Sequence, residues 1–295
     1  MLLPGIISLK GRANITFVGR KPGLYFMRDY VNNTIDFEDQ GWHRLFMADP
    51  DREGLPVSET DLAIGFFKDR DGLIKRNLKV FLENVPVNIF DSLPPKGCEV
   101  HVARYVAECL KEAGCHIDPE KCIKAALKKA LLKKAGPPVS RDKIILHPGS
   151  GDPRKNFSPD FWLNVAGMLG VEAPFKYLKP IFLLGPAETN LYPFFEKCLR
   201  ATTAEIHFCP DHGQITSLLK KCALYLGHDT GITHLAAMHG IPTVALFRAS
   251  RVAIWRPLGP FVRVIQNENA GAPDLLRRYA RSLINSFAAP PFVLL

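Results

Sequence analysis

The first segment that could do chemistry is residues 147–157 (HPGSGDPRKNF), which follow an apolar run. Two glycines let the backbone of this loop approach a ligand closely. Ser150 offers a hydroxyl and a backbone amide, while Arg154 and Lys155 offer fixed positive charge. Such a loop suits a diphosphate, although its spacing is not that of a Walker A loop. We therefore predict that Ser150 and Lys155 contact phosphate, with an ordinary turn as the alternative.

A second loop, residues 184–188 (LGPAE), also follows an apolar run. The carboxylate of Glu188 can accept hydrogen bonds from ribose hydroxyls if a nucleotide binds there. Alternatively, Glu188 only stabilises the positive end of a helix dipole. Taken alone, this loop favours the structural role.

The third loop is residues 227–234 (GHDTGITH). A strand ends at its start and a helix opens near Gly231, so the amides of Thr230 and Gly231 are expected to face an incoming anion. His234 lies about one turn into that helix. Asp229 is expected to orient His234 or the loop backbone, the alternative being a helix N-cap.

Alternating strands and helices must position these loops. The pattern indicates strands at 143–147, 180–184, 205–208, 223–227 and 243–247, and helices at about 159–169, 189–200, 215–221 and 231–239. This alternation predicts an α/β fold with a parallel, doubly wound sheet. Ligands of such sheets bind beyond the carboxyl ends of the strands, where all three loops are expected to lie.

The first half of the chain is less regular. It predicts strands at 15–19, 61–67 and 85–90, and helices at 101–113 and 119–134. In the last of these, Ile123, Leu127 and Leu131 recur at i, i+4 among lysines. We expect them to pack on the core, although such a helix can also lie on an anionic membrane. The segment AGPPVSRD (135–142) resembles a linker, which places the domains at 1–138 and 139–295.

Composition narrows the class of protein. With 47% hydrophobic and 23% charged residues among 295, the chain is typical of a globular protein. The net charge of +9 favours anionic partners or simply solubility. The seven cysteines form no CxxC pair and fit neither a zinc site nor a disulfide framework, so we expect a reducing compartment, the cytoplasm, and no metal. Neither a membrane-spanning run nor a signal peptide is evident.

The runs HPGSGDPRKNFSPDFW (147–162), GHDTGITHLAAMHGIPTVALF (227–247) and WRPLG (255–259), taken in this order, resemble glycosyltransferase family 9. That family contains the ADP-heptose:lipopolysaccharide heptosyltransferases. The resemblance is strong over about 140–265 and fainter over 1–140. It implies GT-B architecture, with two Rossmann-like domains facing across a cleft and the second domain holding the nucleotide sugar.

The resemblance also implies a reaction and a set of site residues. The reaction is inverting, needs no metal or other cofactor, and moves heptose from ADP-heptose onto the lipopolysaccharide inner core at the cytoplasmic face of the inner membrane. Such an enzyme is cytoplasmic or peripheral on that membrane. The residues that match the family's nucleotide-sugar site are Ser150, Lys155, Glu188, Asp229, Thr230, Gly231 and His234.

The beginning of the chain departs from the family pattern. Family members begin with a strand and a loop whose acidic residue is the expected general base. Here Leu3-Pro4-Gly5 resembles the tail of that loop, and the strand and the acid before it are missing. Asp29, Asp36 and Asp61 lack the family context, so no catalytic base is assigned. We expect an incomplete first domain, from a truncated or misassigned start, rather than a rewired active site.

Three other functions compete with a heptosyltransferase. A nucleotide-sugar-binding protein without catalysis would bind the donor but transfer nothing. A nucleotide-sugar 2-epimerase would use other acids and bases, and lacks the paired HPGS and DTGxxH loops. Binding of nucleic acid is supported by the charge alone, without a recognisable motif.

Overall fold

The computed structural model describes residues 1–295 except 40, 51–53, 58, 133–139, 267–272 and 289–295. Contacts divide the chain into two compact units, Met1–Ile123 and Lys124–Leu295. The division falls within helix α5 (Pro119–Lys128), before the segment 135–142 that the sequence marks as a linker. Most of that segment lies outside the described residues, and the division into domains at 138 and 139 stays a prediction.

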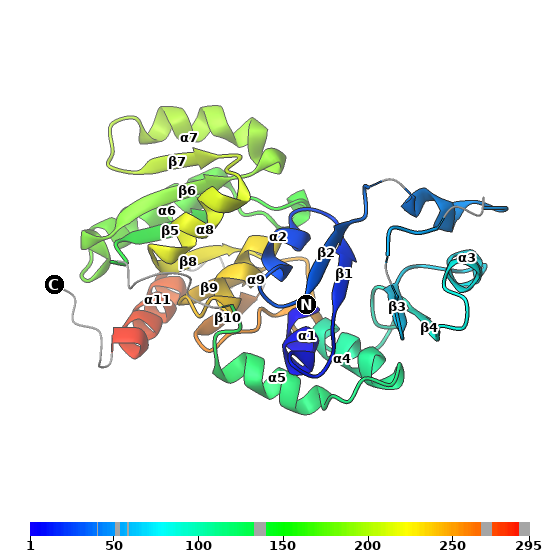
Figure 1. Ribbon diagram of the computed structural model, residues 1–295. Helices are drawn as coiled ribbons and strands as arrows, with labels where there is room; N and C mark the ends of the chain where they lie inside the picture. The colour runs from blue at the N-terminus through cyan, green and yellow to red at the C-terminus, as the bar shows by residue number, and fades with distance from the viewer. Residues whose placement is uncertain (40, 51–53, 58, 133–139, 267–272, 289–295) are drawn as a thin grey trace. The chain divides into compact units, whose positions relative to one another are not determined.

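The second unit is built on one parallel sheet of six strands, in the order β10-β9-β8-β5-β6-β7 (Figure 1). Its strands are β5 (Lys143–His147), β6 (Lys179–Leu184), β7 (Glu205–Phe208), β8 (Cys222–His228), β9 (Thr243–Phe247) and β10 (Val262–Gln266). The central strands are continuous apolar runs because both of their faces are covered, as expected of a parallel sheet. The predicted α/β fold with a doubly wound sheet is confirmed for this unit.

Helices cover the sheet of the second unit. They are α6 (Pro159–Gly170), α7 (Tyr192–Leu199), α8 (His212–Lys220), α9 (Gly231–Met238), α10 (Val252–Trp255) and α11 (Pro273–Ala288), with short 3-10 turns η2 (Pro153–Lys155), η3 (Phe175–Tyr177) and η4 (Pro186–Leu191). Side chains of α6, α7 and α11, among them Trp162, Phe195 and Leu276, pack against alternate residues of the strands. This packing fixes the loops at the strand ends.

Local sequence explains where these helices begin. Pro159 opens α6, and Ser158 caps it by accepting a hydrogen bond from the amide of Phe161. At the start of α8, Asp211 and Gln214 form a capping box. The sequence placed the start of α8 three residues too late, at Ile215, because it followed the apolar residues rather than the cap.

In its described residues, the first unit contains four short strands in two separate parallel pairs. One sheet pairs β1 (Thr16–Gly19) with β2 (Asn33–Asp36), and the other pairs β3 (Ala63–Phe66) with β4 (Val87–Phe90). Its helices are α1 (Leu3–Leu9), α2 (Gly23–Met27), η1 (Trp42–Phe46), α3 (Leu73–Phe81) and α4 (Val102–Glu112), followed by α5. A core around Trp42, Leu45 and Leu78 joins η1 and α3 to strands of both sheets.

Helix α5 corrects one sequence prediction. It ends at Lys128 instead of 134, and residues 133 and 134 are outside the described range. The expected stripe is also wrong, because Leu127 is 36% exposed. The buried residues are Cys122 and Ala126, which lie on a different face of the helix. The small side chains of Cys122 and Ala126 allow this helix to pack closely. The prediction was wrong because it followed the larger apolar residues.

Within the described part of the chain, every helix is too short or too polar to cross a membrane.

Candidate functional site

The order of strands in the second unit predicts where a ligand binds. From β5 the chain builds β6 and β7 on one side, then returns to place β8 on the other side of β5. Such a reversal opens a crevice at the carboxyl ends of the two central strands. His147 at the end of β5 pairs with Gly227 near the end of β8, so the first and third loops lie side by side as predicted.

Lys155, Asp229 and His234 form the charged centre of this edge. The Lys155 ammonium donates to Oδ2 of Asp229 over 2.8 Å, and His234 Nε2 lies 3.3 Å from Oδ1 of the same carboxylate. Burial opposes ionisation of Asp229, but the hydrogen bonds from His234 and Lys155 outweigh it and lower its pKa to about 2. The carboxylate is therefore ionised at neutral pH and holds the lysine at the loop junction.

Asp229 is not the cap of helix α9. Thr230 takes that place, with extended backbone and its hydroxyl accepting from the amide of Thr233. The amides of Gly231 and Ile232 at the start of α9 have no acceptor among the described residues. These donors and the positive end of the helix dipole can bind an anion.

Ser150 and Glu188 have mainly structural contacts. The Ser150 hydroxyl donates toward the Asp152 carbonyl and toward Oδ1 of Asn156, at 2.8 and 2.6 Å, so it holds the loop in shape. Glu188 is only 2% exposed and its Oε2 accepts from the Gly185 amide over 2.6 Å. Burial raises the pKa of Glu188, partly offset by that hydrogen bond.

Glu188 also touches the first loop. A Cβ built on Gly149 would lie 1.9 Å from Cγ of Glu188, so only glycine fits there. The second loop thus packs against the first loop and supports its position. The structure brings all seven predicted residues to one edge of the sheet, with Ser150 and Glu188 turned toward the loops themselves.

The sequence analysis missed a buried polar network beneath the loops. The hydroxyl of Tyr225, in β8, lies 2.8 Å from Nδ1 of His147 and 3.3 Å from the hydroxyl of Thr233. Thr233 in turn donates to the carbonyl of His228 over 2.5 Å, and the Thr230 hydroxyl lies 3.3 Å from His147 Nδ1. One phenol therefore links the ends of β5 and β8 to the first turn of α9.

Two histidines in this layer are neutral at pH 7. Burial lowers the pKa of His147 to about 4 and that of His228 to about 3. His228 Nε2 accepts from the Phe157 amide over 3.0 Å, and its ring stacks on Phe157 with centroids 5.6 Å apart. These contacts anchor the end of the first loop against the third.

Arg248, just after β9, is a further cation that the sequence analysis missed. It donates to the carbonyl of Asn156 over 2.7 Å, and its guanidinium lies 5.6 Å from the centre of the Phe157 ring. In the sequence, the polar residues that directly follow the buried strand β9 could have identified it. Arg154, in contrast, is paired with Asp152 and has an 83% exposed side chain.

The first unit offers no clear catalytic acid among the three considered. Asp29 and Asp61 are exposed, and Asp61 lies just before β3 rather than at its carboxyl end. Asp36 ends β2 and bonds the Glu38 amide, which with the ammonium of Lys21 lowers the pKa of its carboxyl group. Among the described residues, no group of three or more His, Cys, Asp or Glu is placed to hold a metal.

Comparison with known families gives one match. The sequence model of glycosyltransferase family 9 (heptosyltransferase) matches residues 92–281, well over half of the chain. This range contains every residue of the site described above. A comparison with curated protein sequences gives no match.

Solved structures with a similar fold include E. coli ADP-heptose lps heptosyltransferase II, which is 16% identical, with 98% of this chain and 96% of that chain covered at a TM-score of 0.64. E. coli heptosyltransferase WaaC with ADP is 11% identical, with coverages of 96% and 95% and a TM-score of 0.68. WaaC with ADP-2-deoxy-2-fluoro heptose is 12% identical, with coverages of 95% and 94% and a TM-score of 0.61. The likeness shows an α/β fold of GT-B type.

Proposed function

Because this chain belongs to glycosyltransferase family 9, the heptosyltransferase family, we propose that its second unit binds ADP-heptose or a similar nucleotide sugar. The observation that carries the proposal is the junction of Lys155, Asp229 and the amides at the start of α9. Two solved structures of similar fold hold ADP or a fluorinated ADP-heptose. The same ligand class suits a site with a partly buried lysine and unpaired helix amides.

The diphosphate is proposed to lie between Lys155 and the start of α9. Lys155 has a 27% exposed side chain, so its ammonium can reach a ligand while it keeps one contact with Asp229. Gly231 places no side chain between the helix amides and the phosphate. Asp229 then acts as a positioning residue, because it holds both Lys155 and His234.

We propose inverting transfer of heptose that needs no metal. When the bond between the anomeric carbon and the diphosphate breaks, negative charge develops on the departing ADP. Lys155 and the amides of Gly231 and Ile232 stabilise that charge without reorganisation, which is the main catalytic effect of preorganised donors. The acceptor hydroxyl loses a proton in this step, and the residue that takes it is not assigned.

The proposed acceptor is the inner core of lipopolysaccharide, at the cytoplasmic face of the inner membrane, with the protein cytoplasmic or peripheral on that membrane. This part of the proposal rests on the family alone.

Calorimetry with ADP tests the donor site. Lys155→Ala should weaken ADP binding about ten- to a hundredfold, because a charge-assisted hydrogen bond to phosphate is lost. His234→Ala should weaken it less. Arg154→Ala is the matched control, since its side chain is exposed and already paired with Asp152. Equal affinity in Lys155→Ala, His234→Ala and wild type would refute the phosphate site.

Transfer is tested separately, by release of ADP from ADP-heptose with and without an inner-core acceptor. Acceptor-dependent release supports the heptosyltransferase. Tight ADP binding with no release would instead favour the alternative, a nucleotide-sugar-binding protein with impaired catalysis.

A further inference from the structure

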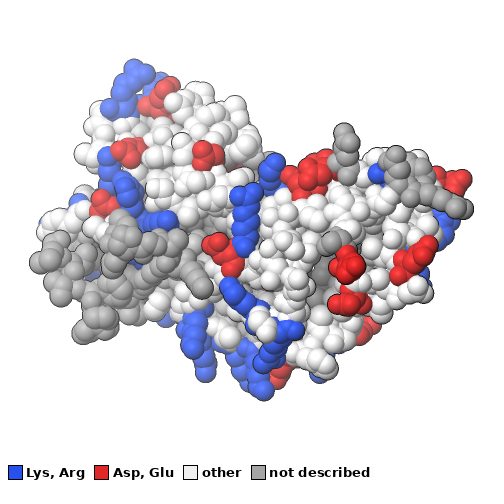
Figure 2. Space-filling model, viewed as in Figure 1, with Lys and Arg blue, Asp and Glu red and all other residues white. Residues whose placement is uncertain are grey.

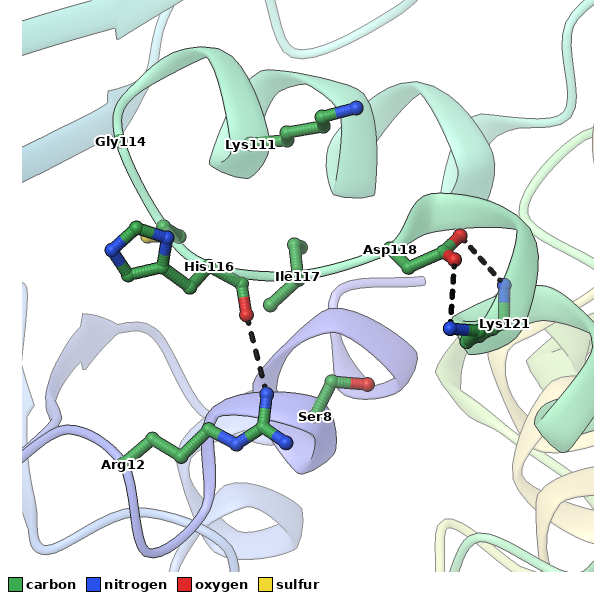
Figure 3. A pocket seen from close by; sticks show the side chains of 9 residues that line it. Ser8, Arg12, Lys111, Gly114, His116, Ile117, Asp118 and Lys121 are labelled. Atoms are coloured by element: carbon green, nitrogen blue, oxygen red, sulfur yellow. Dashed lines mark hydrogen bonds and ion pairs between the residues drawn. The ribbon is translucent and has the colours of Figure 1, made fainter.

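A pocket of about 720 Å³ lies in the first unit, away from the residues discussed so far. It is an open pocket lined by the end of α1, the turn after it, the end of α4 and the start of α5 (Figure 3). Ligand sites in proteins commonly have about 300–1,000 Å³. The space therefore suits a small organic molecule rather than a single inorganic ion.

Positive side chains from three elements surround this pocket. Arg12 follows α1, Lys111 lies in the last turn of α4, and Lys121 lies in the first turns of α5. Figure 3 shows Arg12 on the α1 side of the pocket, with Asp118 and Lys121 next to each other at the start of α5. In the space-filling view, Lys and Arg also gather where Figure 1 shows α5 (Figure 2).

These cations are only partly neutralised by the protein. Lys121 pairs with Asp118 over 3.5 Å, whereas Arg12 makes a long 3.4 Å contact to the carbonyl of His116. The Lys111 ammonium has no hydrogen bond or ion pair with any described residue. One carboxylate thus faces three fixed charges, and the local excess favours an anion.

The floor of the pocket is apolar or small. Ile117 is buried, Cys115 is half-buried, and a Cβ built on Gly114 would meet no atom within 4 Å. A charged rim above an apolar floor selects a ligand with an anionic group on a carbon body.

The position of the pocket separates it from the edge where sheet ligands bind. Helix α1 precedes β1, with the short segment 10–15 between them, so the end of the helix lies toward the amino end of that strand. Ligands of parallel sheets bind at the opposite, carboxyl ends.

We propose that this pocket binds an organic phosphate, with the phosphate held by Arg12, Lys111 and Lys121 and the carbon body resting on Ile117 and Cys115. Guanidinium and ammonium groups are the usual phosphate ligands in proteins. The phosphate belongs either to a soluble metabolite or to a lipid headgroup, and the experiment below distinguishes the two.

Cys115 provides the direct readout, because it lines the pocket. The full chain, kept free of ADP because ADP is itself an organic phosphate, is alkylated with a small maleimide and mapped by mass spectrometry. Butyl phosphate at about ten times its dissociation constant should slow alkylation of Cys115 about tenfold, because only the unoccupied pocket leaves the thiol free to react. Cys198 and Cys209 are exposed in the second unit and should react unchanged. Unchanged Cys115 reactivity both with millimolar butyl phosphate and with the vesicles described below would overturn the proposal.

Charge variants test the rim. Arg12→Ala and Lys111→Ala should each abolish the protection of Cys115 and leave ADP affinity unchanged. Lys79→Ala is the matched control, since Lys79 is exposed on α3 of the same unit and does not line the pocket. If Lys79→Ala loses protection to the same extent, the effect is one of general charge and the site is refuted.

Vesicles separate the two sources of phosphate. Phosphatidylcholine vesicles with phosphatidic acid should protect Cys115 and sediment the wild-type chain, but not Lys111→Ala, if the ligand is a headgroup. Protection by butyl phosphate without either effect of vesicles assigns the pocket to a soluble phosphate. Protection by neither probe would overturn the proposal.

Discussion

The two units of this chain differ in how deeply their ion pairs are buried. In the second unit, one six-stranded sheet places Lys155 and Asp229 together with side chains 27% and 6% exposed. In the first, two separate pairs of strands carry ion pairs such as that of Arg20 and Glu38, with side chains 67% and 66% exposed. Exposed ion pairs contribute little to stability. Buried ion pairs cost desolvation free energy unless good geometry and further hydrogen bonds offset it. The contrast agrees with our proposal that the nucleotide diphosphate binds in the second unit.

Acid should destabilise the second unit more than the first. His147 is fully buried with a pKa of about 4, below the ordinary 6.5, so the folded state excludes a proton that the unfolded chain accepts. Stability is complete above pH 6.5 and falls as the pH drops toward 4, by roughly 3 kcal/mol for this ring. His43 and His116 of the first unit are exposed.

Urea unfolding between pH 7 and 4 measures this loss. It is followed by tryptophan fluorescence in a Trp42→Phe background, in which the remaining tryptophans, Trp162 and Trp255, both lie in the second unit. His147→Gln should reduce the loss with acid, since the buried His228 still contributes to it, and His43→Gln should not. The same slope in both variants would break the contrast between the units.

Gly149→Ala should cost about 1–3 kcal/mol and weaken ADP binding, because the new methyl group overlaps Cγ of Glu188 and forces the two loops apart. Gly151→Ala in the same loop and Gly23→Ala in the first unit add a methyl group to open space. Thermal unfolding and ADP calorimetry of the three variants provide the test. Equal effects of Gly149→Ala and Gly151→Ala would show that the loops are not packed against each other.

Two tyrosines give the smallest and most closely matched comparison. Tyr225→Phe removes the phenol that bonds His147 in the second unit, and should cost about 1–2 kcal/mol because a buried partner is left unsatisfied. Tyr105→Phe removes an exposed hydrogen bond to the Asp91 carbonyl in the first unit, and should cost less than about 0.5 kcal/mol. Urea unfolding measures both. A larger loss from Tyr105→Phe would reverse the comparison.

The sequence predicted the second unit better than the first for a physical reason. Strands β5 and β9 have the predicted bounds, because apolar runs flanked by turns are distinctive when a strand is covered on both faces. The half-buried edge strand β7 also has the predicted bounds. Strand β2 (Asn33–Asp36, NTID) was missed because it is polar, half-exposed and only four residues long. In the first unit, the secondary structure of such segments depends on tertiary packing, which the local sequence pattern does not reveal.

The same reasoning explains the site. Polar residues that follow a strand, such as Lys155 and Asp229, are visible candidates in the sequence because ligands of parallel sheets bind beyond the carboxyl ends of the strands. Tyr225 was not visible, since a tyrosine in an apolar strand resembles any core residue until its hydroxyl partner is known. Its partner His147 lies 78 positions away in the sequence and becomes its neighbour only when β5 pairs with β8.

Amide hydrogen exchange of the full chain with and without ADP tests the central claim most directly. The account predicts that ADP slows exchange in residues 147–157 and 228–234, the loops after β5 and β8, and leaves Met1–Ile123 unchanged. Slowed exchange confined to the first unit, or none in either loop at saturating ADP, would contradict the assignment of the nucleotide site to the second unit.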